Sequence, residues 1–368
     1  MSCDYKALAN KGVQGLHPYQ AGKPTSELER ELGITNIVKL ASNENPLGVS
    51  TKVKKVLAGE LDELSRYPDS NGYYLKSALA EQMMVKPEQV TLGNGSNDIL
   101  ELLARTFVND SHEVIFSQHA FVVYPIVTQA IGATPVAVSA KNWGHDLDAM
   151  ADAITERTKL IFIANPNNPT GTFLTSKALR HFLEQVPEHV IVVLDEAYYE
   201  YVAKDERAPS VQWLSHFPNL VVSRTFSKAY GLAGLRIGYA VTSEEIAGLI
   251  NRVRQPFNCN SLSLAAAEAV LDDTDYLTAS IEINRVGMKQ LTEAFNAMGL
   301  EYIPSHGNFV TVDVQTNGAE VYDALLQEGV IVRPIGGYGL PNHLRVSIGL
   351  ESENQRFIDA LKKVLQLP

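Results

Sequence analysis

The sequence is poor in cysteine and in positive charge. Its 368 residues include two cysteines, Cys3 and Cys259, which are too few for a disulfide framework and lack the spacing of metal ligands. Lys and Arg total 31 against 42 Asp and Glu, so the formal net charge is -11. Binding of nucleic acid depends on clustered basic residues that neutralise phosphates. We therefore expect no metal centre and no nucleic-acid partner.

Long apolar runs are also missing. No run approaches the roughly 18 apolar residues that a membrane-spanning helix needs; the longest resemble VIVVL at 190–194. The opening MSCDYKALANKG has no apolar stretch behind a basic start, so it does not resemble a secretory signal. These features predict a cytoplasmic protein without a membrane anchor.

Short apolar runs alternate with longer amphipathic stretches from about residue 50 to 260. The runs EVIFS, TKLIFIA, HVIVVLD and NLVVSRT are typical of buried strands. Such alternation predicts an α/β fold with a mostly parallel sheet flanked by helices. The last hundred residues differ, because a long helical stretch at about 275–298 precedes the strand-like NFVTVDV and HLRVSIG. We predict an N-terminal arm (1–45), a large domain (46–257) and a smaller α+β domain (258–368). Ser26 with Glu29 and Ser352 with Gln355 have the spacing of capping boxes, which predicts that a helix begins at each serine.

Polar clusters follow several of the predicted strands. NPNNPTG follows IFIA, DEAYYEY follows VIVVL, and RTFSKAYG follows LVVS. In open parallel sheets, ligands bind beyond the carboxyl ends of the strands. The three clusters are therefore expected to meet in one site.

The segment VTLGNGSNDILELLARTF at 90–107 has the form of a phosphate cradle. Gly93 and Gly95 let the backbone come close to a ligand, and Ser96 is expected to cap a helix whose first N–H groups attract an anion. The pattern is neither a dinucleotide fingerprint nor a P-loop. An ordinary glycine turn before a serine-capped helix accounts for the same letters.

Two further clusters supply polar groups at strand ends. In NPNNPTG, prolines restrict the backbone, so the amide of Asn168 could be held at a fixed angle. Asp195 ends a buried run, where a carboxylate is costly unless a cation or donor meets it, and Tyr198 follows three residues later. A protonated pyridine nitrogen is one such partner. A plain turn and a helix-capping Asp are the alternatives.

The segment SRTFSKAYGLAGLRIGYA at 223–240 places Lys228 where a buried strand ends. A lysine whose pKa is lowered in such surroundings can form a Schiff base. Arg236 can grip a phosphate through parallel hydrogen bonds. A fixed lysine, a phosphate cradle and a carboxylate for a ring nitrogen together match the demands of pyridoxal phosphate.

The order GNGSND, NPNNPTG, DEAYYEY, SRTFSKAYGLAGLRIG and LRVSIG resembles that of the type I fold aminotransferases over nearly the whole chain. Further matches in VKLASNENPLG, RYPD and NRVRQPFN make it most similar to the histidinol-phosphate aminotransferases, especially the second bacterial form. The resemblance implies the type I fold of enzymes that depend on pyridoxal 5'-phosphate.

The resemblance implies a role for each matching residue. Lys228 would bond covalently to the cofactor and move a proton, Asp195 would pair with the ring nitrogen, and Tyr198 would hydrogen-bond the ring hydroxyl. The remaining cofactor-binding positions are Ser96, Asn97, Phe121 (ring stacking, where many relatives carry Tyr), Asn168, Thr225, Ser227 and Arg236. Tyr67 would reach the cofactor phosphate of a partner subunit, which implies a homodimer with shared active sites.

The substrate side follows from the same resemblance. Arg345 matches the arginine that binds the anionic group of the substrate, and Tyr19, Asn43 and Arg333 are expected to line the same pocket. The expected reaction is transamination between L-histidinol phosphate and 2-oxoglutarate, giving imidazole-acetol phosphate and glutamate, in histidine biosynthesis. An aromatic amino acid aminotransferase and a decarboxylase of a phosphorylated amino acid are alternatives with the same cofactor.

A regulator that binds the cofactor without catalysis is a third alternative. Regulators of that kind carry an additional DNA-binding domain. About 45 residues precede the predicted large domain, and they contain no helix-turn-helix pattern. The sequence therefore favours an enzyme.

Overall fold

The central sheet is built mostly from strands whose side chains are buried on both faces; the edge strand at 134–138 is the exposed exception. The computed structural model describes residues 3–18 and 22–367, and within them the largest sheet has seven strands in the order β2-β8-β7-β6-β5-β3-β4. β8 is antiparallel to its two neighbours, and the other strands run parallel. The strands are β2 (Val90–Gly93), β3 (Glu113–Ser117), β4 (Thr134–Val138), β5 (Thr158–Ala164), β6 (Ile191–Asp195), β7 (Leu220–Thr225) and β8 (Gly238–Val241). The predicted α/β class is confirmed.

Alternate residues of each strand point to opposite faces of this sheet, so each face has its own core. One core packs Val114 and Phe162 against α6 (Ser96–Phe107), α7 (Val123–Ile131) and α10 (Glu244–Val253). The other core packs Ile115 and Ile161 against helices of the opposite face. These helices are α4 (Thr51–Glu60), α5 (Tyr73–Met83), α8 (Leu147–Asp152), α9 (Ser176–Leu183) and α11 (Ser261–Leu271). Consecutive apolar residues fill the middle of EVIFS and the end of TKLIFIA because both faces of the sheet are covered.

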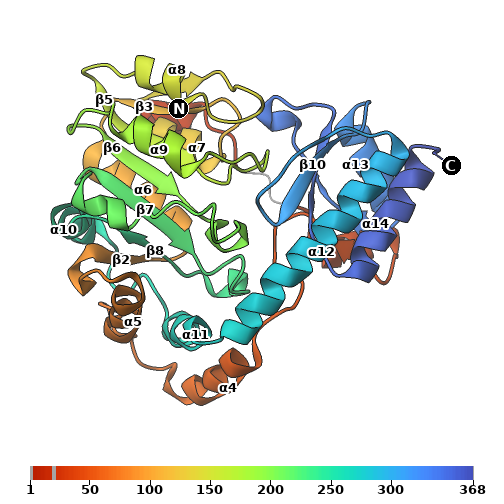
Figure 1. Ribbon diagram of the computed structural model, residues 1–368, viewed down its shortest axis with the longest axis horizontal. Helices are drawn as coiled ribbons and strands as arrows, with labels where there is room; N and C mark the ends of the chain where they lie inside the picture. Colours follow the sequence, from red (N-terminus) through yellow and green to blue (C-terminus); the bar gives the residue numbers. More distant parts are fainter. Residues whose placement is uncertain (1–2, 19–21, 368) are drawn as a thin grey trace.

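A second, antiparallel sheet lies in the C-terminal part of the chain (Figure 1). Its order is β12-β13-β10-β9, with β9 (Tyr302–Ile303), β10 (Phe309–Asp313), β12 (Arg333–Pro334) and β13 (His343–Ser347). It packs against α12 (Thr274–Met298), α13 (Gly318–Gln327) and α14 (Glu351–Val364). Short 3-10 turns complete the chain: η1 (Leu61–Glu63), η2 (Pro87–Gln89), η3 (Tyr199–Tyr201), η4 (Gln212–Ser215), η5 (Ala233–Leu235) and η6 (Gly336–Tyr338).

The 25-residue helix α12 connects the two regions. Its first turns contact α11 and η3 beside the large sheet, and its later turns contact β10 and α14 (Figure 1). Ala266 and Val270 of α11 belong to a core of the large sheet, whereas the core of the small sheet takes Leu291 and Phe295 from α12. The packing partner therefore changes along α12. The predicted domain limits at 45 and 257 stay a prediction.

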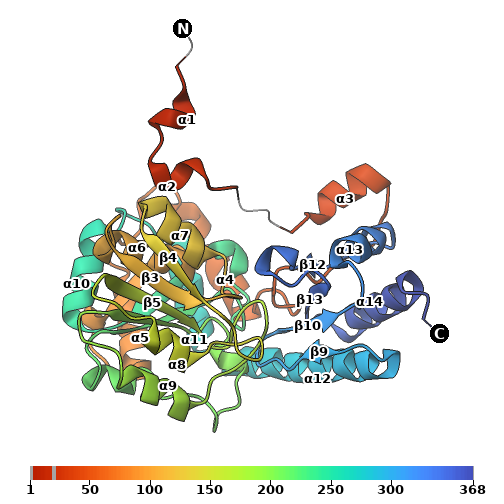
Figure 2. The same cartoon turned by 90° about the horizontal axis from the view of Figure 1, so that it is seen from above.

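The N-terminal segment extends over both regions. α1 (Tyr5–Leu8) lies away from the body, α2 (Lys11–Gln14) packs on α7, and α3 (Thr25–Leu32) lies beside α13 (Figure 2). The chain then pairs β1 (Val38–Lys39) in parallel with β11 (Val330–Ile331). This pairing fixes residues 41–45 at the junction of the two sheets.

Three helix caps lie one or two residues before the position that the sequence predicts. Gly95, with a φ of 83°, is the N-cap of α6, so Ser96 is the first helical residue and not the cap. The capping pairs expected at Ser26 and Ser352 are also wrong, because α3 starts at Thr25 after Pro24 and α14 starts at Glu351 after Leu350. At α14 the Glu353 carboxylate accepts the Leu350 N–H instead.

Candidate active site

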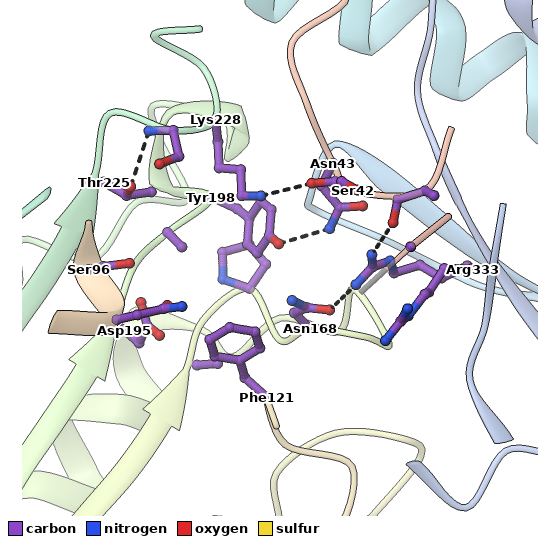
Figure 3. Close-up of a pocket in the computed structure, with 18 of the residues that line it drawn as sticks. Ser42, Asn43, Ser96, Phe121, Asn168, Asp195, Tyr198, Thr225, Lys228 and Arg333 are labelled. Carbon is purple, nitrogen blue, oxygen red and sulfur yellow. Dashed lines mark hydrogen bonds between the residues drawn. The ribbon is translucent and has the colours of Figure 1, made fainter. Parts of the chain in front are cut away.

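One pocket lies at the carboxyl ends of β5, β6 and β7, where the N-terminal segment and the small sheet meet the large sheet (Figure 3). The polar clusters of the sequence therefore converge as expected. Its lining includes nearly the full predicted set: Asn43, Ser96, Asn97, Phe121, Asn168, Asp195, Tyr198, Thr225, Ser227, Lys228, Arg236, Arg333 and Arg345. Tyr67 lies elsewhere, and Tyr19 falls outside the described residues.

Lys228 is a half-buried lysine in the lining of this pocket. Its Nζ donates to the carbonyl oxygen of Ser42 at 3.1 Å. Burial, with help from the positive charge of Arg345, lowers the pKa of Lys228 to about 7. A large share of its amino groups is therefore neutral and nucleophilic near neutral pH.

Asp195 holds one carboxylate oxygen for a partner outside the described chain. Its Oδ2 accepts the Tyr124 hydroxyl at 2.8 Å, whereas its buried Oδ1 has no hydrogen-bond partner among the described residues. Burial raises the pKa of Asp195 to about 6, against the lowering effect of the Tyr124 hydrogen bond. An unmatched buried oxygen is costly, and a protonated ring nitrogen would satisfy it.

The phosphate cradle forms where the start of α6 meets Arg236. A Cβ on Gly95 would collide with the guanidinium of Arg236, and one on Gly238 would lie 2.5 Å from the Ser96 nitrogen. Glycine at both positions leaves room for an anion at the first N–H groups of α6. Arg236 donates to the Ser227 hydroxyl at 3.2 Å, so both point to the same place.

The opposite wall of the pocket carries the arginines from the small sheet. Arg345 on β13 donates to Asn168 Oδ1 at 2.7 Å and to the Ala41 carbonyl at 2.6 Å. Arg333 on β12 pairs in register with Arg345 and lines the same pocket. Two guanidinium groups in one wall suit an anionic group on a substrate.

The stacking position is occupied by Phe121. Its ring meets Tyr124 edge-on, with centroids 5.8 Å apart, and Tyr124 stacks in turn on Phe162 at 4.5 Å. Because Tyr124 also donates to Asp195, one buried side chain supports both the aromatic wall and the carboxylate. Sequence reasoning missed Tyr124; its only signal was its position three residues after Phe121.

Sequence reasoning also missed the backbone of Ala41 and Ser42. Their carbonyl groups accept from Arg345 and Lys228, respectively. Backbone acceptors carry no residue-type signal, so no motif could have revealed them.

Tyr67 is 82% exposed and stacks on Phe257 with ring centroids 4.6 Å apart. Its expected contact with a partner's cofactor stays a prediction.

Within residues 3–18 and 22–367, no group of three or more His, Cys, Asp or Glu could hold a metal ion. No helix in the same ranges is long and apolar enough to cross a bilayer.

Comparisons with known proteins agree on one family. Residues 35–361 match the family described as Aminotransferase class I and II. The chain is 68% identical to Histidinol-phosphate aminotransferase 1 of Idiomarina loihiensis over 97% of both chains. It is 62% identical to Histidinol-phosphate aminotransferase 2 of Pasteurella multocida, over 99% of this chain and 100% of that protein.

A solved structure extends the agreement to three dimensions. The crystal structure of histidinol-phosphate aminotransferase from Sinorhizobium meliloti, in complex with pyridoxal-5'-phosphate, superposes with a TM-score of 0.90 at 28% identity and covers 97% of both chains. With sequence, fold and pocket in accord, the chain belongs to the class I and II aminotransferase family, in its group of histidinol-phosphate aminotransferases.

Proposed function

We propose that this protein catalyses the reversible transamination between L-histidinol phosphate and 2-oxoglutarate, with imidazole-acetol phosphate and glutamate as the other pair. In histidine biosynthesis glutamate is the amino donor and L-histidinol phosphate is the product. The names of relatives that are 62–68% identical over almost their full length support this reaction. The single observation that carries it is the pocket itself. Lys228 lies between a cradle for one phosphate and a pair of arginines for a second anionic group.

The residues of the pocket fit pyridoxal 5'-phosphate. When bound, this cofactor supplies a carbonyl carbon that accepts the amino group and a ring that draws electrons from the substrate carbon. Asp195 Oδ1 is the acceptor for the ring N–H, because it is buried without a partner among the described residues. Arg236, Ser227, Thr225 and the N–H groups of Ser96 and Asn97 hold the phosphate.

Lys228 is the group that attaches the cofactor and then carries the proton. With its pKa lowered to about 7, the amine could accept a proton from the substrate carbon and return it to the carbon on the other side of the transferred nitrogen. Tyr198, Asn168 and Phe121 line the same pocket (Figure 3). The Tyr198 hydroxyl and the Asn168 amide would hold the ring oxygen of the cofactor, and Phe121 would stack on its ring.

Arg345 and Arg333 bind the anionic end of the substrate. The phosphate of histidinol phosphate and a carboxylate of glutamate or 2-oxoglutarate present similar oxygens to a guanidinium. One wall can therefore serve both halves of the reaction, in which donor and acceptor occupy the pocket in turn. Such a covalent relay gives ping-pong kinetics.

A comparison of amino donors tests the proposal. The purified, cofactor-loaded protein is supplied with 2-oxoglutarate and with histidinol phosphate, phenylalanine or phosphothreonine, and glutamate is measured. We expect the highest kcat/KM with histidinol phosphate. A higher value with phenylalanine would identify an aromatic aminotransferase, and release of carbon dioxide from phosphothreonine would identify a decarboxylase.

We also propose that the protein is a homodimer with shared active sites. Large apolar side chains are exposed close together in sequence: Leu61, Leu64, Tyr67, Tyr73 and Tyr74. Several exposed large apolar side chains in one short segment support a subunit interface there. Light scattering on the eluted protein should give about twice the 40.3 kDa of the chain.

Shared sites predict complementation. Mixing the Lys228→Ala and Tyr67→Ala variants at limiting cofactor should restore activity that neither variant has alone, because one site of each hybrid dimer is intact. A mixture no more active than its components would contradict shared sites. A cytoplasmic location belongs to the same proposal, and cell fractionation checks it.

A further inference from the structure

Three consecutive residues of the N-terminal segment touch three side chains of the pocket. Ala41 accepts from Arg345, Ser42 accepts from Lys228, and Asn43 donates through Nδ2 to the Tyr198 hydroxyl at 2.9 Å. Asn43 is 1% exposed and has a φ of 55°, a left-handed conformation that asparagine tolerates. The sequence suggested Asn43 as a substrate contact; Asn43 lines the pocket, and that role stays a prediction.

The polar groups of Asn43 are held from several sides. Its backbone N–H donates to Ser347 Oγ at 2.8 Å, and its carbonyl accepts from Asn308 Nδ2 at 3.0 Å. The Ser347 hydroxyl donates in turn to Asn43 Oδ1 at 2.9 Å. Ser347 and Asn308 are both buried, so these contacts are protected from water.

The Ser347 hydroxyl decides which end of the Asn43 amide faces Tyr198. The two ends of an amide have nearly the same shape, so only their partners can fix its direction. With Oδ1 accepting from Ser347, the donor Nδ2 faces the Tyr198 oxygen. In the reverse orientation, Asn43 would accept the Tyr198 hydrogen and the Ser347 hydroxyl would lose this acceptor.

The direction of the amide has a consequence for Tyr198. A phenol has one hydrogen, and a donor that already faces its oxygen cannot receive it. We propose that Asn43 and Ser347 are positioning residues that keep the Tyr198 hydrogen directed at the ring oxygen of the cofactor. This proposal rests on the proposed function, because it assumes the cofactor site described above.

With the Tyr198 hydrogen directed at the ring oxygen, the pKa of the cofactor-loaded site should be lower. A hydrogen bond to a negatively charged oxygen stabilises the deprotonated form. The proton shared between the Lys228 nitrogen and the ring oxygen is then released at a lower pH. Loss of the Tyr198 donor raises the pH at which this proton is released. The visible absorbance of the cofactor-loaded protein measures this pH without any substrate.

Charged groups on the surrounding elements also act on the proton that Lys228 shares with the ring oxygen. Arg345 comes from β13, Asp195 from the end of β6, Arg236 from the turn before β8, and Glu44 from the N-terminal segment. The Tyr338 phenol also faces Tyr198 from η6. Because all of these stay in place in the variants below, a difference between variants isolates the hydrogen-bond direction.

The experiment is a pH titration of the visible absorbance of four loaded proteins: wild type, Tyr198→Phe, Asn43→Asp and the double variant. Tyr198→Phe should raise the midpoint by about one pH unit, the usual scale of one hydrogen bond to a charged group. Asn43→Asp replaces the donor Nδ2 by an acceptor that takes the Tyr198 hydrogen, so it should raise the midpoint to a similar extent. In the Tyr198→Phe background the same substitution should add less than about 0.3 unit.

The matched control is Asn45→Asp. Asn45 lies two residues further along and donates to the Ala229 carbonyl and the Ser280 hydroxyl, without touching Tyr198. The Asn45→Asp substitution adds the same charge to the same segment as Asn43→Asp. It should move the midpoint by less than about 0.3 pH unit. Two results would overturn the proposal, because each would show a plain charge effect. One is a midpoint shift by Asn43→Asp that persists in the Tyr198→Phe background. The other is the same shift in the Asn45→Asp variant.

The Ser347 variants give a second, milder test that does not depend on Asn43→Asp folding. Ser347→Ala should raise the midpoint and Ser347→Thr, which keeps the hydroxyl, should restore it. Thermal melting and cofactor content, measured for each variant, identify loss of fold. Failure of the wild type to bind the cofactor would refute the proposed function, whereas normal binding with no shift in the Ser347→Ala or Asn43→Asp variant would refute only this inference.

Discussion

The two walls of the pocket are assembled in different ways. On the cofactor side, Ser227 bonds Thr225 two residues away and Arg236 bonds Ser227 nine residues away. On the substrate side, the bond from Arg345 to Asn168 spans 177 residues and its bond to Ala41 spans 304. The cofactor wall is therefore carried mostly by the large sheet and its helices, and the substrate wall exists only when the two sheets and the N-terminal segment are in place.

This difference separates binding of the cofactor from recognition of the substrate. The cradle depends on one helix start and one turn, both fixed by the core of the large sheet. Arg345 and Arg333 lie on strands of the small sheet. The small sheet is connected to the large sheet through α12 and the N-terminal segment. Changes in the first wall should affect the cofactor, and changes in the second should affect substrate affinity.

The largest expected effect is on the cofactor wall, at Lys228. Lys228→Ala should abolish the visible absorbance change on adding the cofactor and lower turnover by at least about 10²–10⁴-fold, because both attachment and proton transfer are lost. Absorption spectra and steady-state rates measure this. Lys76→Ala is the control, since Lys76 is a buried lysine with a lowered pKa outside the pocket. Normal turnover by Lys228→Ala would refute the site.

The next effect is on the substrate wall. Arg345→Lys keeps the charge but loses the fork that bonds Asn168 and Ala41, so kcat/KM should fall between about tenfold and a hundredfold, mainly through KM. Cofactor affinity, measured by fluorescence titration, should stay within about twofold. Arg356→Lys on α14 is a control outside the pocket. An equal loss of cofactor affinity in Arg345→Lys would show that the two walls are not separable.

The pH dependence of cofactor capture reports on the cofactor wall alone. Attack on the carbonyl needs the neutral amine, and a pKa of about 7 makes Lys228 neutral in rising proportion as the pH increases through that value. The rate of the absorbance change should therefore rise about tenfold from about pH 6 to about pH 8. Stopped-flow mixing of cofactor-free protein measures it. A rate that keeps rising in proportion to hydroxide up to about pH 10 would mean that burial does not lower the pKa of Lys228.

The smallest expected effect is at Tyr124, which supports the cofactor wall from behind. Tyr124→Phe removes a donor to Asp195, so kcat should fall between about threefold and tenfold. The lost hydrogen bond also raises the pKa of Asp195, so the acidic limb of the pH–rate profile should move to higher pH. Tyr302→Phe, in the small sheet beside Phe295, is the matched control. An unchanged acidic limb would contradict the inferred effect of Tyr124 on the pKa of Asp195.

The same contrast explains which parts could be predicted. The apolar runs of β3, β5, β6 and β7 are explicit in the sequence, because strands covered on both faces need continuous apolar residues. The polar residues at or shortly after the ends of those runs predicted three site residues, Asn168, Asp195 and Lys228. The small offsets at Ser96, Ser26 and Ser352 arose because a cap depends on backbone conformation, which residue type specifies only loosely.

The sequence by itself determined the α/β class, the parallel strands and the polar residues at their ends, since burial on two faces and the turn chemistry at strand ends leave a local pattern. Only the tertiary structure decided which contacts those residues make: the Tyr124 bond to Asp195, the carbonyl partners of Lys228 and Arg345, and the Asn43–Ser347 pair. Asn43 and Ser347 lie 304 residues apart. Contacts over such separations, or through backbone atoms common to every residue, leave no pattern in a single sequence, so they become visible when the chain has folded.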